Sequence, residues 1–468
     1  MTDMENKNAW EKYPEGKERQ SLMDFAEDYR KFISKCKTER ECVQEFEALA
    51  KQAGFVSLEE RKKENAPLKA GEKIYAVQMG KAMALFVIGT KDFEQGMNIL
   101  GAHIDSPRLD LKQVPLYEDT EMAMFDTHYY GGVKKYQWVT MPLAIHGVFA
   151  KKDGTVTPVN IGDKPDDPVF GISDLLIHLS AEQLEKKAAK VIEGEKLDLL
   201  IGSIPMKSEE EKEEAKETVK KNILRILKDM YQIEEEDFLS AELEVVPAGE
   251  ARDYGFDRSM IMGYGHDDRV CAYPSFRAIL EMQKPEKTSV CLLVDKEEIG
   301  SVGATGMQSR FFEDTVAELL NLSNGYSEIS LRRAMRNSSM LSSDVSAAFD
   351  PNYPEVTEKR NAAYFGKGLV FNKYTGSRGK SGSNDANAEY MAKIRNILDQ
   401  KNITFQTSEL GKVDQGGGGT IAYILANYGM QVIDSGVAVL NMHAPWEIIS
   451  KVDLYEALLG YQAFLKEA

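Results

Sequence analysis

The stretch TSVCLLVDKEE at residues 288–298 contains the apolar run that most directly indicates the fold. An unbroken run of this kind, bounded by charged residues, is typical of a strand that is buried on both faces of a sheet. Residues 385–400, DANAEYMAKIRNILDQ, have the apolar spacing of a helix, and residues 429–444, GMQVIDSGVAVLNMHA, contain a second strand-like run. Strands that alternate with helices predict an α/β sheet domain.

The N-terminal quarter of the chain extends this pattern. Residues 20–52 carry apolar side chains at helical spacing and predict an amphipathic helix. Residues 73–104 then change to the short β-rich runs KIYAVQMG, MALFVIG and MNILGAHI, which glycine and Lys-Asp turn signals separate. We therefore expect a compact group of strands in this region.

Residues 113–246 differ in sequence pattern from the rest of the chain. They contain runs typical of antiparallel strands and an Asp153–Gly154 hairpin signal. The charged run at 207–221 has mixed signs and precedes ILRIL, which favours a solvated helix. We predict that residues 113–246 form an inserted, mostly-β domain, and that residues 1–112 and 247–468 together form a discontinuous main domain.

Composition restricts the class of protein. The formal net charge is 58 − 75 = −17, so a nucleic-acid partner, which needs a basic face, is not expected. The four cysteines form no CxxC pair and indicate a reducing compartment rather than a disulfide framework. No apolar run reaches the ~20 residues that span a bilayer, and we find no signal peptide. We expect no membrane partner and a cytoplasmic location.

Polar residues follow three of the predicted strands, where α/β sheets place their ligand sites. His103 and Asp105 follow MNILGA, and residues two apart on a strand share a face. A carboxylate beside a histidine commonly orients a metal ligand. The adjacent Glu297 and Glu298 can divide metal binding and proton transfer between them. His443 follows VAVLN, before Pro445.

Each of these features also has a structural explanation when taken alone. A His–Asp contact, a solvated Lys-Glu-Glu turn and a core histidine are all ordinary, and Asp344 alone resembles a helix N-cap. Asp267 lies in the boundary motif GYGHDDRVCAY. Together, however, the ordered histidines and carboxylates form an N/O ligand set suited to Zn²⁺, Mn²⁺ or Co²⁺.

Five ordered blocks together resemble the aspartyl aminopeptidase family of co-catalytic zinc metallo-aminopeptidases, in its bacterial branch. The blocks are GAHIDSPRLDLK, GHDDRVCAY, LLVDKEEIGSVGATGMQS, SSDVSAAFDPNY and NMHAPWE. The resemblance covers nearly the whole chain. It implies a phosphorylase/hydrolase-like α/β catalytic domain with a mixed central sheet, and an enzyme that removes the N-terminal residue from peptides with a free N-terminus.

The resemblance also assigns roles to the residues of the blocks. Two divalent metal ions per subunit are expected, zinc by preference, with Asp267 bridging both. His103 and Asp344 are expected to complete one ion's protein ligands. Glu298 and His443 are expected to complete the other's, with Glu297 as general base and Asp105 orienting His103. Family members often have a non-proline cis peptide bond after the bridging aspartate, so we expect one between Asp267 and Asp268.

The resemblance further implies that residues 113–246 form dimers, which assemble into a tetrahedral dodecamer. In relatives a histidine from this domain reaches the neighbour's active site. His178 in DLLIHLS is its nearest match, although a histidine on an apolar helix face explains the same pattern.

The preferred substrate stays open. Arg378 or Lys380 in TGSRGKSGSN could supply the cation that acidic residues require. This segment does not align cleanly with acid-selective members, and some relatives prefer neutral residues, so the sequence does not establish a preference for Asp or Glu. Two alternative functions remain: a related di-metal deacylase of N-acyl amino acids, and a catalytically silent assembly or carrier protein of the same fold.

Overall fold

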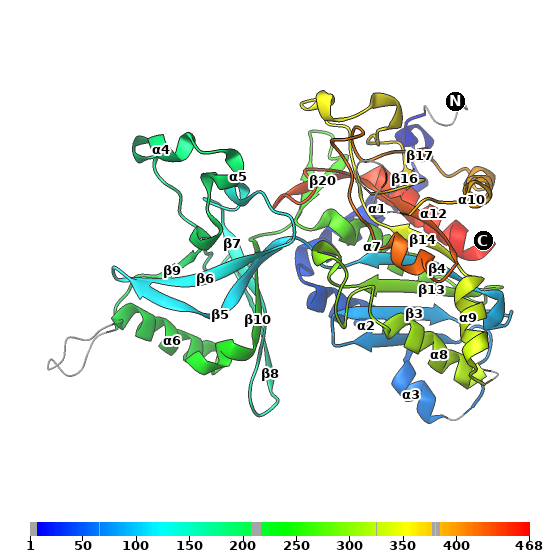
Figure 1. The fold of residues 1–468 in the computed structure, drawn as a ribbon, viewed down its shortest axis with the longest axis horizontal. Helices are drawn as coiled ribbons and strands as arrows, with labels where there is room; N and C mark the ends of the chain where they lie inside the picture. The colour runs from blue at the N-terminus through cyan, green and yellow to red at the C-terminus, as the bar shows by residue number, and fades with distance from the viewer. Residues whose placement is uncertain (1–6, 65, 207–216, 324, 377–379, 381–383) are drawn as a thin grey trace. The chain divides into compact units, whose positions relative to one another are not determined.

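The computed structural model describes residues 7–64, 66–206, 217–323, 325–376, 380 and 384–468 (Figure 1). The chain divides into two compact units, each of which is described separately. The first comprises Met1–Ser106, Ala251–Met442 and Glu447–Ala468, and the second comprises Pro107–Glu250 and His443–Trp446.

A nine-stranded sheet forms the centre of the first unit. Its strands, in spatial order, are β1 (Val56–Ser57), β2 (Lys73–Gln78), β3 (Ala82–Val87), β13 (Thr288–Val294), β4 (Met97–His103), β14 (Ser339–Ser343), β18 (Gln431–Gly436), β16 (Leu369–Asn372) and β17 (Phe405–Thr407). Four neighbours, β13, β4, β14 and β18, run parallel. Because β3 and β16 are antiparallel to their neighbours in this group, the sheet is mixed.

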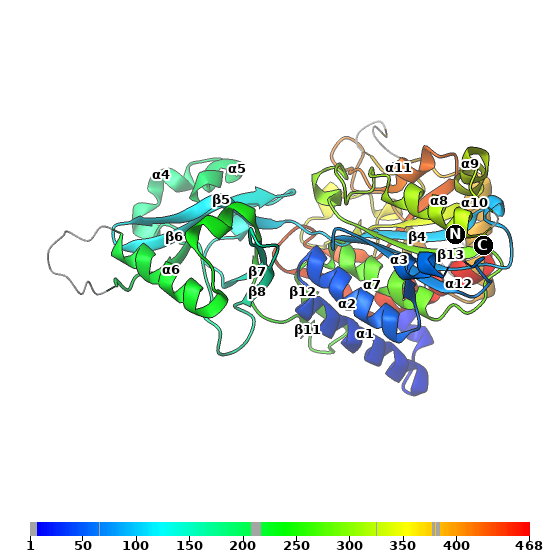
Figure 2. The same cartoon turned by 90° about the horizontal axis from the view of Figure 1, so that it is seen from below.

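Helices cover both faces of this sheet, which Figure 2 shows nearly edge-on. One core lies under α1 (Lys17–Lys35), α2 (Glu39–Gln52), α7 (His266–Leu280), α10 (Ala388–Gln400) and α12 (Lys451–Glu467). The other lies under α3 (Leu58–Lys63), α8 (Phe311–Ser323), α9 (Glu328–Arg336) and α11 (Ala422–Ala426). The mixed α/β architecture expected from the sequence is confirmed.

Strand β13 shows why its sequence is apolar at every position. Cys291 and Leu293 enter the first core, whereas Val290, Leu292 and Val294 enter the second. Successive side chains of a strand point to opposite faces, so a strand with a core on each side needs apolar residues throughout.

The predicted single helix over residues 20–52 is in fact two helices. Helix α1 ends at Lys35, and α2 begins at Glu39. Thr38 accepts a hydrogen bond from the backbone N–H of Glu41, and the Glu41 side chain accepts one from the N–H of Thr38. This capping box starts a new helix within a continuous amphipathic pattern.

A smaller sheet of five strands completes the first unit. In spatial order these are β11 (Arg252–Tyr254), β12 (Met260–Gly263), β20 (Glu447–Ser450), β19 (Ala438–Leu440) and β15 (Ser346–Ala347). Strand β12 leads directly into α7, and β15 follows β14 closely. The smaller sheet therefore fixes segments that border the carboxyl edge of the central sheet.

The second unit contains an antiparallel sheet of six strands. In spatial order these are β8 (Val156–Ile161), β7 (Leu143–Ala150), β10 (Ala241–Pro247), β5 (Arg108–Asp119), β6 (Met122–Tyr130) and β9 (Leu199–Gly202). Its helices are α4 (Ala181–Leu184), α5 (Ala188–Val191) and α6 (Thr218–Tyr231). The predicted hairpin joins β7 to β8, with Gly154 at a φ of 88°. Most of the charged run predicted as a helix, residues 207–216, lies outside the described residues.

The cysteines and the helices bear on the expected absence of disulfides and of membrane-spanning segments. All four cysteines are buried and free, so none forms a disulfide. Among the described residues, no helix is both long enough and apolar enough to cross a membrane.

Candidate metal centre

The parallel strands of the central sheet bring the candidate residues to one edge. Val294, the last residue of β13, lies opposite His103, the last residue of β4. Strand β14 is the other neighbour of β4 and ends one residue before Asp344. Because these strands run in the same direction, the residues that follow them meet at their carboxyl ends.

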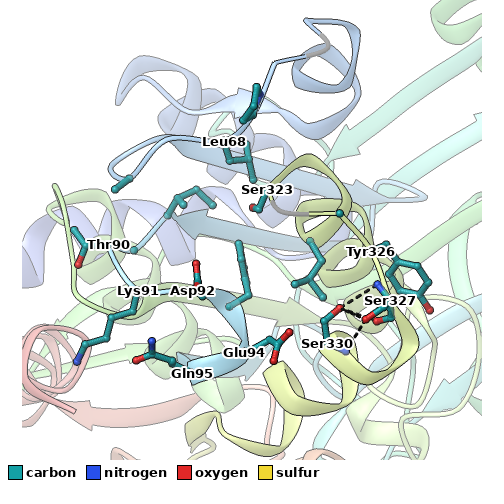
Figure 3. A pocket seen from close by; sticks show the side chains of 17 residues that line it. Leu68, Thr90, Lys91, Asp92, Glu94, Gln95, Ser323, Tyr326, Ser327 and Ser330 are labelled. Atoms are coloured by element: carbon teal, nitrogen blue, oxygen red, sulfur yellow. Dashed lines mark hydrogen bonds between the residues drawn. The ribbon is translucent and has the colours of Figure 1, made fainter.

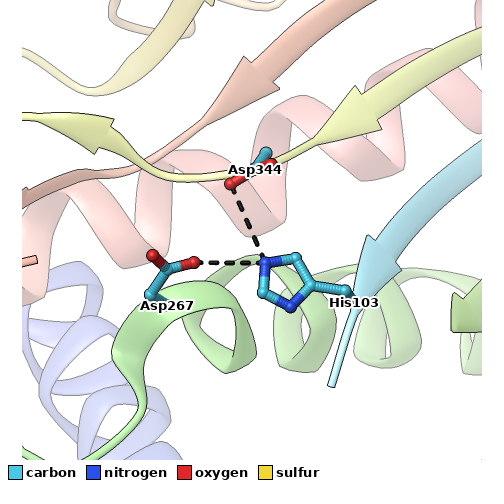
Figure 4. A group of neighbouring side chains, drawn as sticks. All are labelled: His103, Asp267 and Asp344. Carbon is cyan, nitrogen blue, oxygen red and sulfur yellow. Dashed lines mark ion pairs between the residues drawn. The ribbon is translucent and has the colours of Figure 1, made fainter. Parts of the chain in front are cut away.

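The side chains of Asp267 and Asp344 lie close to the imidazole of His103 (Figure 4). His103 Nε2 is 3.2 Å from Asp267 Oδ1 and 4.0 Å from Asp344 Oδ1. His103 and Asp267 are buried, and the Asp344 side chain is 13% exposed. One ligand atom from each residue lies within 4.8 Å of the others, which is compatible with a shared metal ion.

Asp267 is held from both sides of its backbone. Its N–H donates to Glu447 Oε2 at 3.0 Å, and its carbonyl accepts the Ser106 hydroxyl at 2.6 Å. The expected non-proline cis peptide bond is present between Asp267 and Asp268. Asp268 accepts the backbone N–H of His103 at 3.4 Å, which links the start of α7 to the end of β4.

Asp105 connects the histidine to the pair of glutamates. Its Oδ1 is 3.2 Å from His103 Nδ1, and it accepts the N–H of Glu297 at 3.1 Å. Its Oδ2 accepts the N–H of Glu298 at 3.2 Å. His103 Nδ1 also lies 3.0 Å from the carbonyl of Asp105. A single buried carboxylate therefore orients the imidazole and holds the backbone of both glutamates.

The glutamates occupy a short 3-10 turn, η7 (Glu297–Ile299), rather than the end of a regular strand. Lys296 before it and Gly300 after it have positive φ angles of 68° and 99°. The Asp295 carboxylate accepts the Thr305 hydroxyl at 2.6 Å, which closes the loop beyond the turn. The turn frees both side chains from the strict alternation of a strand.

The electrostatics of the centre favour a cation. Burial and the nearby negative charges of Glu297 and Asp268 hold the pKa of Asp344 well above its usual range. Burial opposes protonation of His103, yet hydrogen bonds to Asp105 and Asp267 raise its pKa well above the usual value. This packing of carboxylates around one imidazole leaves excess negative charge, which a divalent cation would neutralise. The donors present thus fit a metal ion.

His443, the remaining candidate ligand, belongs to the second unit. Its Nδ1 lies 3.0 Å from the carbonyl of Gly132 in the same unit. A hydrogen bond from Nδ1 to a carbonyl fixes the tautomer with its lone pair on Nε2, as in many metal-binding histidines. The segment His443–Trp446 is flanked along the chain by Met442 and Glu447, which belong to the first unit.

The candidate substrate residues are less closely connected to this centre. His178 is exposed in the second unit, within the 3-10 turn η4 (Ile177–Leu179) rather than on an α-helix. Lys380 is exposed and lies with Nζ 3.5 Å from the ring centroid of Tyr374. Arg378 lies outside the described residues.

Three residues support the candidate ligands: Asp268, which the sequence indicated only as a further carboxylate beside Asp267, and Ser106 and Glu447, which it did not single out. Ser106 and Asp268 each follow a predicted site residue directly, and Glu447 lies four residues after His443 in the NMHAPWE block. Their positions in the blocks were available as signals. Their hydrogen bonds to Asp267 and His103 could not be predicted from the sequence, because these bonds join segments far apart in the chain.

A cavity of about 860 Å³ opens elsewhere in the first unit (Figure 3). Its lining includes Lys91, Asp92 and Glu94, which directly precede β4, and Tyr326 between α8 and α9. Gly89, also in the lining, donates its N–H to the Thr288 hydroxyl at the start of β13. The cavity therefore lies at the amino ends of the parallel strands, away from the edge that carries the candidate ligands.

The fold and the candidate centre together indicate a metal-dependent enzyme of the α/β class. Comparison with known proteins gives the family: the model described as "Aminopeptidase I zinc metalloprotease (M18)" matches residues 32–465. The chain belongs to this family of zinc metalloproteases and is a metallo-aminopeptidase. The family predicted from the five sequence blocks is thereby confirmed.

Individual relatives are similar over almost their full length. A probable M18 family aminopeptidase 1 of Clostridium acetobutylicum is 64% identical over 461 residues, which cover 98% of each chain. The crystal structure of an M18 aminopeptidase from Thermotoga maritima superposes with a TM-score of 0.93 at 46% identity and covers 100% of both chains. The structure of aminopeptidase I from Clostridium acetobutylicum gives a TM-score of 0.89 at 62% identity, with 98% and 99% covered.

Proposed function

We propose that this aminopeptidase uses two divalent metal ions, zinc by preference, and that Asp267 would be a ligand of both. His103 and Asp344 complete the first ion's protein ligands. Glu298 and His443 complete the second's. The observation that carries the proposal is the buried approach of His103 Nε2 to Asp267 and Asp344, at 3.2 and 4.0 Å. The ligand types are those that zinc prefers.

Metal ions held by these residues would supply Lewis-acid chemistry at the scissile carbonyl and would lower the pKa of a water molecule. Glu297 is the proposed general base, which removes a proton from the attacking water and returns it to the leaving amine. Asp105 holds the Glu297 N–H at 3.1 Å and so keeps this base at a fixed place beside the imidazole.

The first test compares free and blocked peptides. The purified enzyme is assayed with aminoacyl-arylamides and with a peptide in free and N-acetylated forms, before and after exhaustive chelation. We expect activity on free N-termini only, loss on chelation and recovery with Zn²⁺, Mn²⁺ or Co²⁺. Full activity after metal removal would contradict the metal mechanism. Hydrolysis of the acetylated form alone would favour the N-acyl amino acid deacylase.

The second test concerns the base. Glu297→Gln keeps the side-chain shape but removes the proton acceptor, so we expect kcat to fall by about 10²–10⁴-fold with metal content unchanged. Glu355→Gln, at an exposed position in the 3-10 turn η8 (Pro354–Val356), is the matched control and should leave kcat unchanged. Wild-type turnover by Glu297→Gln would exclude Glu297 as the base.

We also propose that the chain forms a homo-oligomer through its second unit. The support is a surface, here called the 169–184 surface, whose large apolar side chains are 53–70% exposed: Val169, Leu175, Leu176, Ile177, Leu179 and Leu184. A group of large, exposed apolar side chains is typical of a protein interface. Yeast aminopeptidase 1 has the same fold, with a TM-score of 0.75 at 20% identity, and has been solved as a dodecamer.

The size of the assembly tests this second proposal. We expect light scattering after gel filtration to show dimers or a dodecamer for the wild type. Ile177→Asp combined with Leu179→Asp should give smaller species, whereas Val413→Asp, an equally exposed position in the first unit, should not. A monomeric wild type would refute the proposal. His178 lies between Ile177 and Leu179 on the 169–184 surface, and we propose that in the oligomer it reaches the active site of the neighbouring subunit. His178→Ala should therefore lower activity without removing metal.

A further inference from the structure

A buried carboxylate that the proposed chemistry does not use lies at the base of the loop that carries Glu297. Asp295 directly follows β13 and is 1% exposed. A carboxylate buried in this way is costly unless hydrogen bonds or a cation compensate its charge. Its hydrogen-bond partners Lys296 and Thr305 both lie in the loop 296–306, which contains the two glutamates of the candidate centre. Asp295 is therefore placed to determine the shape of that loop.

Asp295 and Thr305 join the two ends of the loop by two separate contacts. The N–H of Asp295 donates to the carbonyl of Thr305 at 3.1 Å, and the Thr305 hydroxyl donates to Asp295 Oδ2 at 2.6 Å. Gly306 forms an isolated parallel bridge with Asp295. A Cβ on Gly306 would lie 2.4 Å from the carbonyl oxygen of Ser301, so the returning chain packs directly against the loop. Both backbone and side-chain contacts thus hold the ends of the loop together.

Lys296 connects Asp295 to the opposite side of the loop. Its backbone N–H donates to Asp295 Oδ1 at 2.7 Å, and its ammonium lies 3.1 Å from Asp295 Oδ2. Its aliphatic carbons pass 3.2 Å from the point where a Cβ on Gly303 would lie. The carbonyl of Lys296 accepts the N–H of Ser301 at 2.6 Å. Lys296 has a φ of 68°, and because lysine has no intrinsic preference for this left-handed conformation, the contacts with Asp295 stabilise it.

Glu297 is the next residue after Lys296, so the direction in which its chain enters the turn depends on that conformation. The N–H groups of Glu297 and Glu298 donate to Asp105 at 3.1 and 3.2 Å. Two buried carboxylates therefore hold the turn in different ways. Asp105 binds its backbone N–H groups, and Asp295 fixes the chain that leads into it.

We propose that Asp295, through Thr305 and Lys296, is a positioning residue for the general base Glu297. This rests on the proposed function, in which Glu297 transfers the proton. A general base has to lie within hydrogen-bond reach of the proton that it removes, so a small displacement of its backbone lowers turnover. Binding of the substrate does not depend on that distance. Weakening the contacts of Asp295 should therefore lower kcat much more than it raises KM.

The first test removes one hydroxyl and keeps the shape of the side chain. Thr305 is buried, and Thr305→Val takes away the hydrogen bond to Asp295 Oδ2. We expect kcat for aminoacyl-arylamides to fall about tenfold, with KM changed less than about threefold and metal content equal to that of the wild type. Thr305→Ser retains the hydroxyl and should restore kcat.

Thr315→Val is the matched control for the lost hydroxyl. Thr315 is buried on α8 and donates its hydroxyl to the Phe311 carbonyl at 2.7 Å, so the same substitution removes a comparable hydrogen bond elsewhere. It should leave kcat and KM unchanged. The same fall in kcat in Thr315→Val would show that the effect is a general loss of stability and would overturn the inference.

A double-mutant cycle with Glu297→Gln shows whether the effect of Thr305 passes through the base. If Thr305 acts by placing Glu297, the tenfold loss in kcat should shrink to less than about twofold once the base is absent, because two changes that act on one group are not additive. A loss that stays about tenfold in the Glu297→Gln background would show that the hydroxyl acts elsewhere, and the inference would be wrong.

Hydrogen exchange supplies a readout that requires neither bound metal nor turnover. In the metal-free protein, Thr305→Val should speed amide exchange in peptides that cover the loop 296–306, whereas Thr315→Val should not. Lys296→Met keeps the aliphatic carbons but removes the ammonium, and it replaces Thr305→Val in all of these measurements if that variant does not fold. Its side chain is 27% exposed, and we expect the same selective loss of kcat.

Three further results would overturn the inference while leaving the proposed function intact: wild-type kcat in Thr305→Val, activity lost only in proportion to metal content, or unchanged exchange in the loop 296–306. Wild-type turnover by Glu297→Gln would instead refute the proposed base itself.

Discussion

Replacing Asp105 with asparagine is the sharpest test of how the centre is organised. The buried carboxylate faces three N–H groups: His103 Nδ1 at 3.2 Å and the backbone N–H groups of Glu297 and Glu298 at 3.1 and 3.2 Å. Asparagine has nearly the same shape but offers one oxygen and one NH₂ group. At least one of the N–H groups must then face a donor instead of an acceptor.

The magnitude follows from the bonds that are lost. A hydrogen bond to a charged acceptor contributes about 1.5–3 kcal/mol, and an unsatisfied buried donor costs a similar amount. If the loss displaces the base or the histidine, kcat/KM should fall by about 10–100-fold, which is the usual effect of mutating a group that orients a metal ligand. Because the fold of the strand edge is kept, the midpoint of thermal unfolding should fall by only a few degrees.

The assay measures kcat/KM with an aminoacyl-arylamide, metal content by elemental analysis, and thermal unfolding on the same preparation. Asp453→Asn is the matched control: Asp453, in the first turn of α12, is equally buried and accepts the N–H groups of Gly366 and Gly368 at 2.8 and 2.7 Å. It should lose stability but keep kcat/KM per folded molecule. Asp105→Asn with kcat/KM within twofold of the wild type would refute the assigned positioning role.

Three further outcomes are expected. Gly436→Ala forces a side chain against the Asp344 carbonyl, so it should destabilise the protein by about 1–3 kcal/mol and lower metal content, whereas Gly171→Ala, with its nearest atom 3.5 Å away, should do neither. Burial raises the pKa of Asp453 to about 7, above its value in the unfolded chain, so this group alone should lower the free energy of unfolding by about 2 kcal/mol from pH 5.5 to 7, because the unfolded state is ionised there and the folded state is mostly not. Denaturant titrations should show that slope flattened in Asp453→Asn, and an unchanged slope would contradict the assignment. Finally, metal removal should lower the unfolding temperature of the wild type by more than that of Asp344→Ala, because bound ions stabilise the folded state; equal shifts would argue against Asp344 as a ligand.

Much of the fold could be predicted from local patterns, for physical reasons that particular segments show. Strand β13 must bury both faces, so its apolar run at 288–294 indicated a strand without reference to any partner. The break between α1 and α2 was missed because the apolar spacing continues through it, and only the capping box at Thr38 marks it. A turn that brings the two glutamates to one cleft could be expected from the sequence, but its geometry depends on the positive φ angles around it, which the sequence did not indicate.

The sequence by itself determined which chemical groups are present and the order in which they follow the strands, since side-chain type and periodicity are local properties. The five blocks were enough to predict the family. Only the tertiary structure decided which groups meet. Asp105 and Glu297 are 192 residues apart, and His103 and Asp268 are 165 apart. Their contacts exist because β13 and β14 flank β4 in parallel register, and no local pattern specifies the order of strands in a sheet.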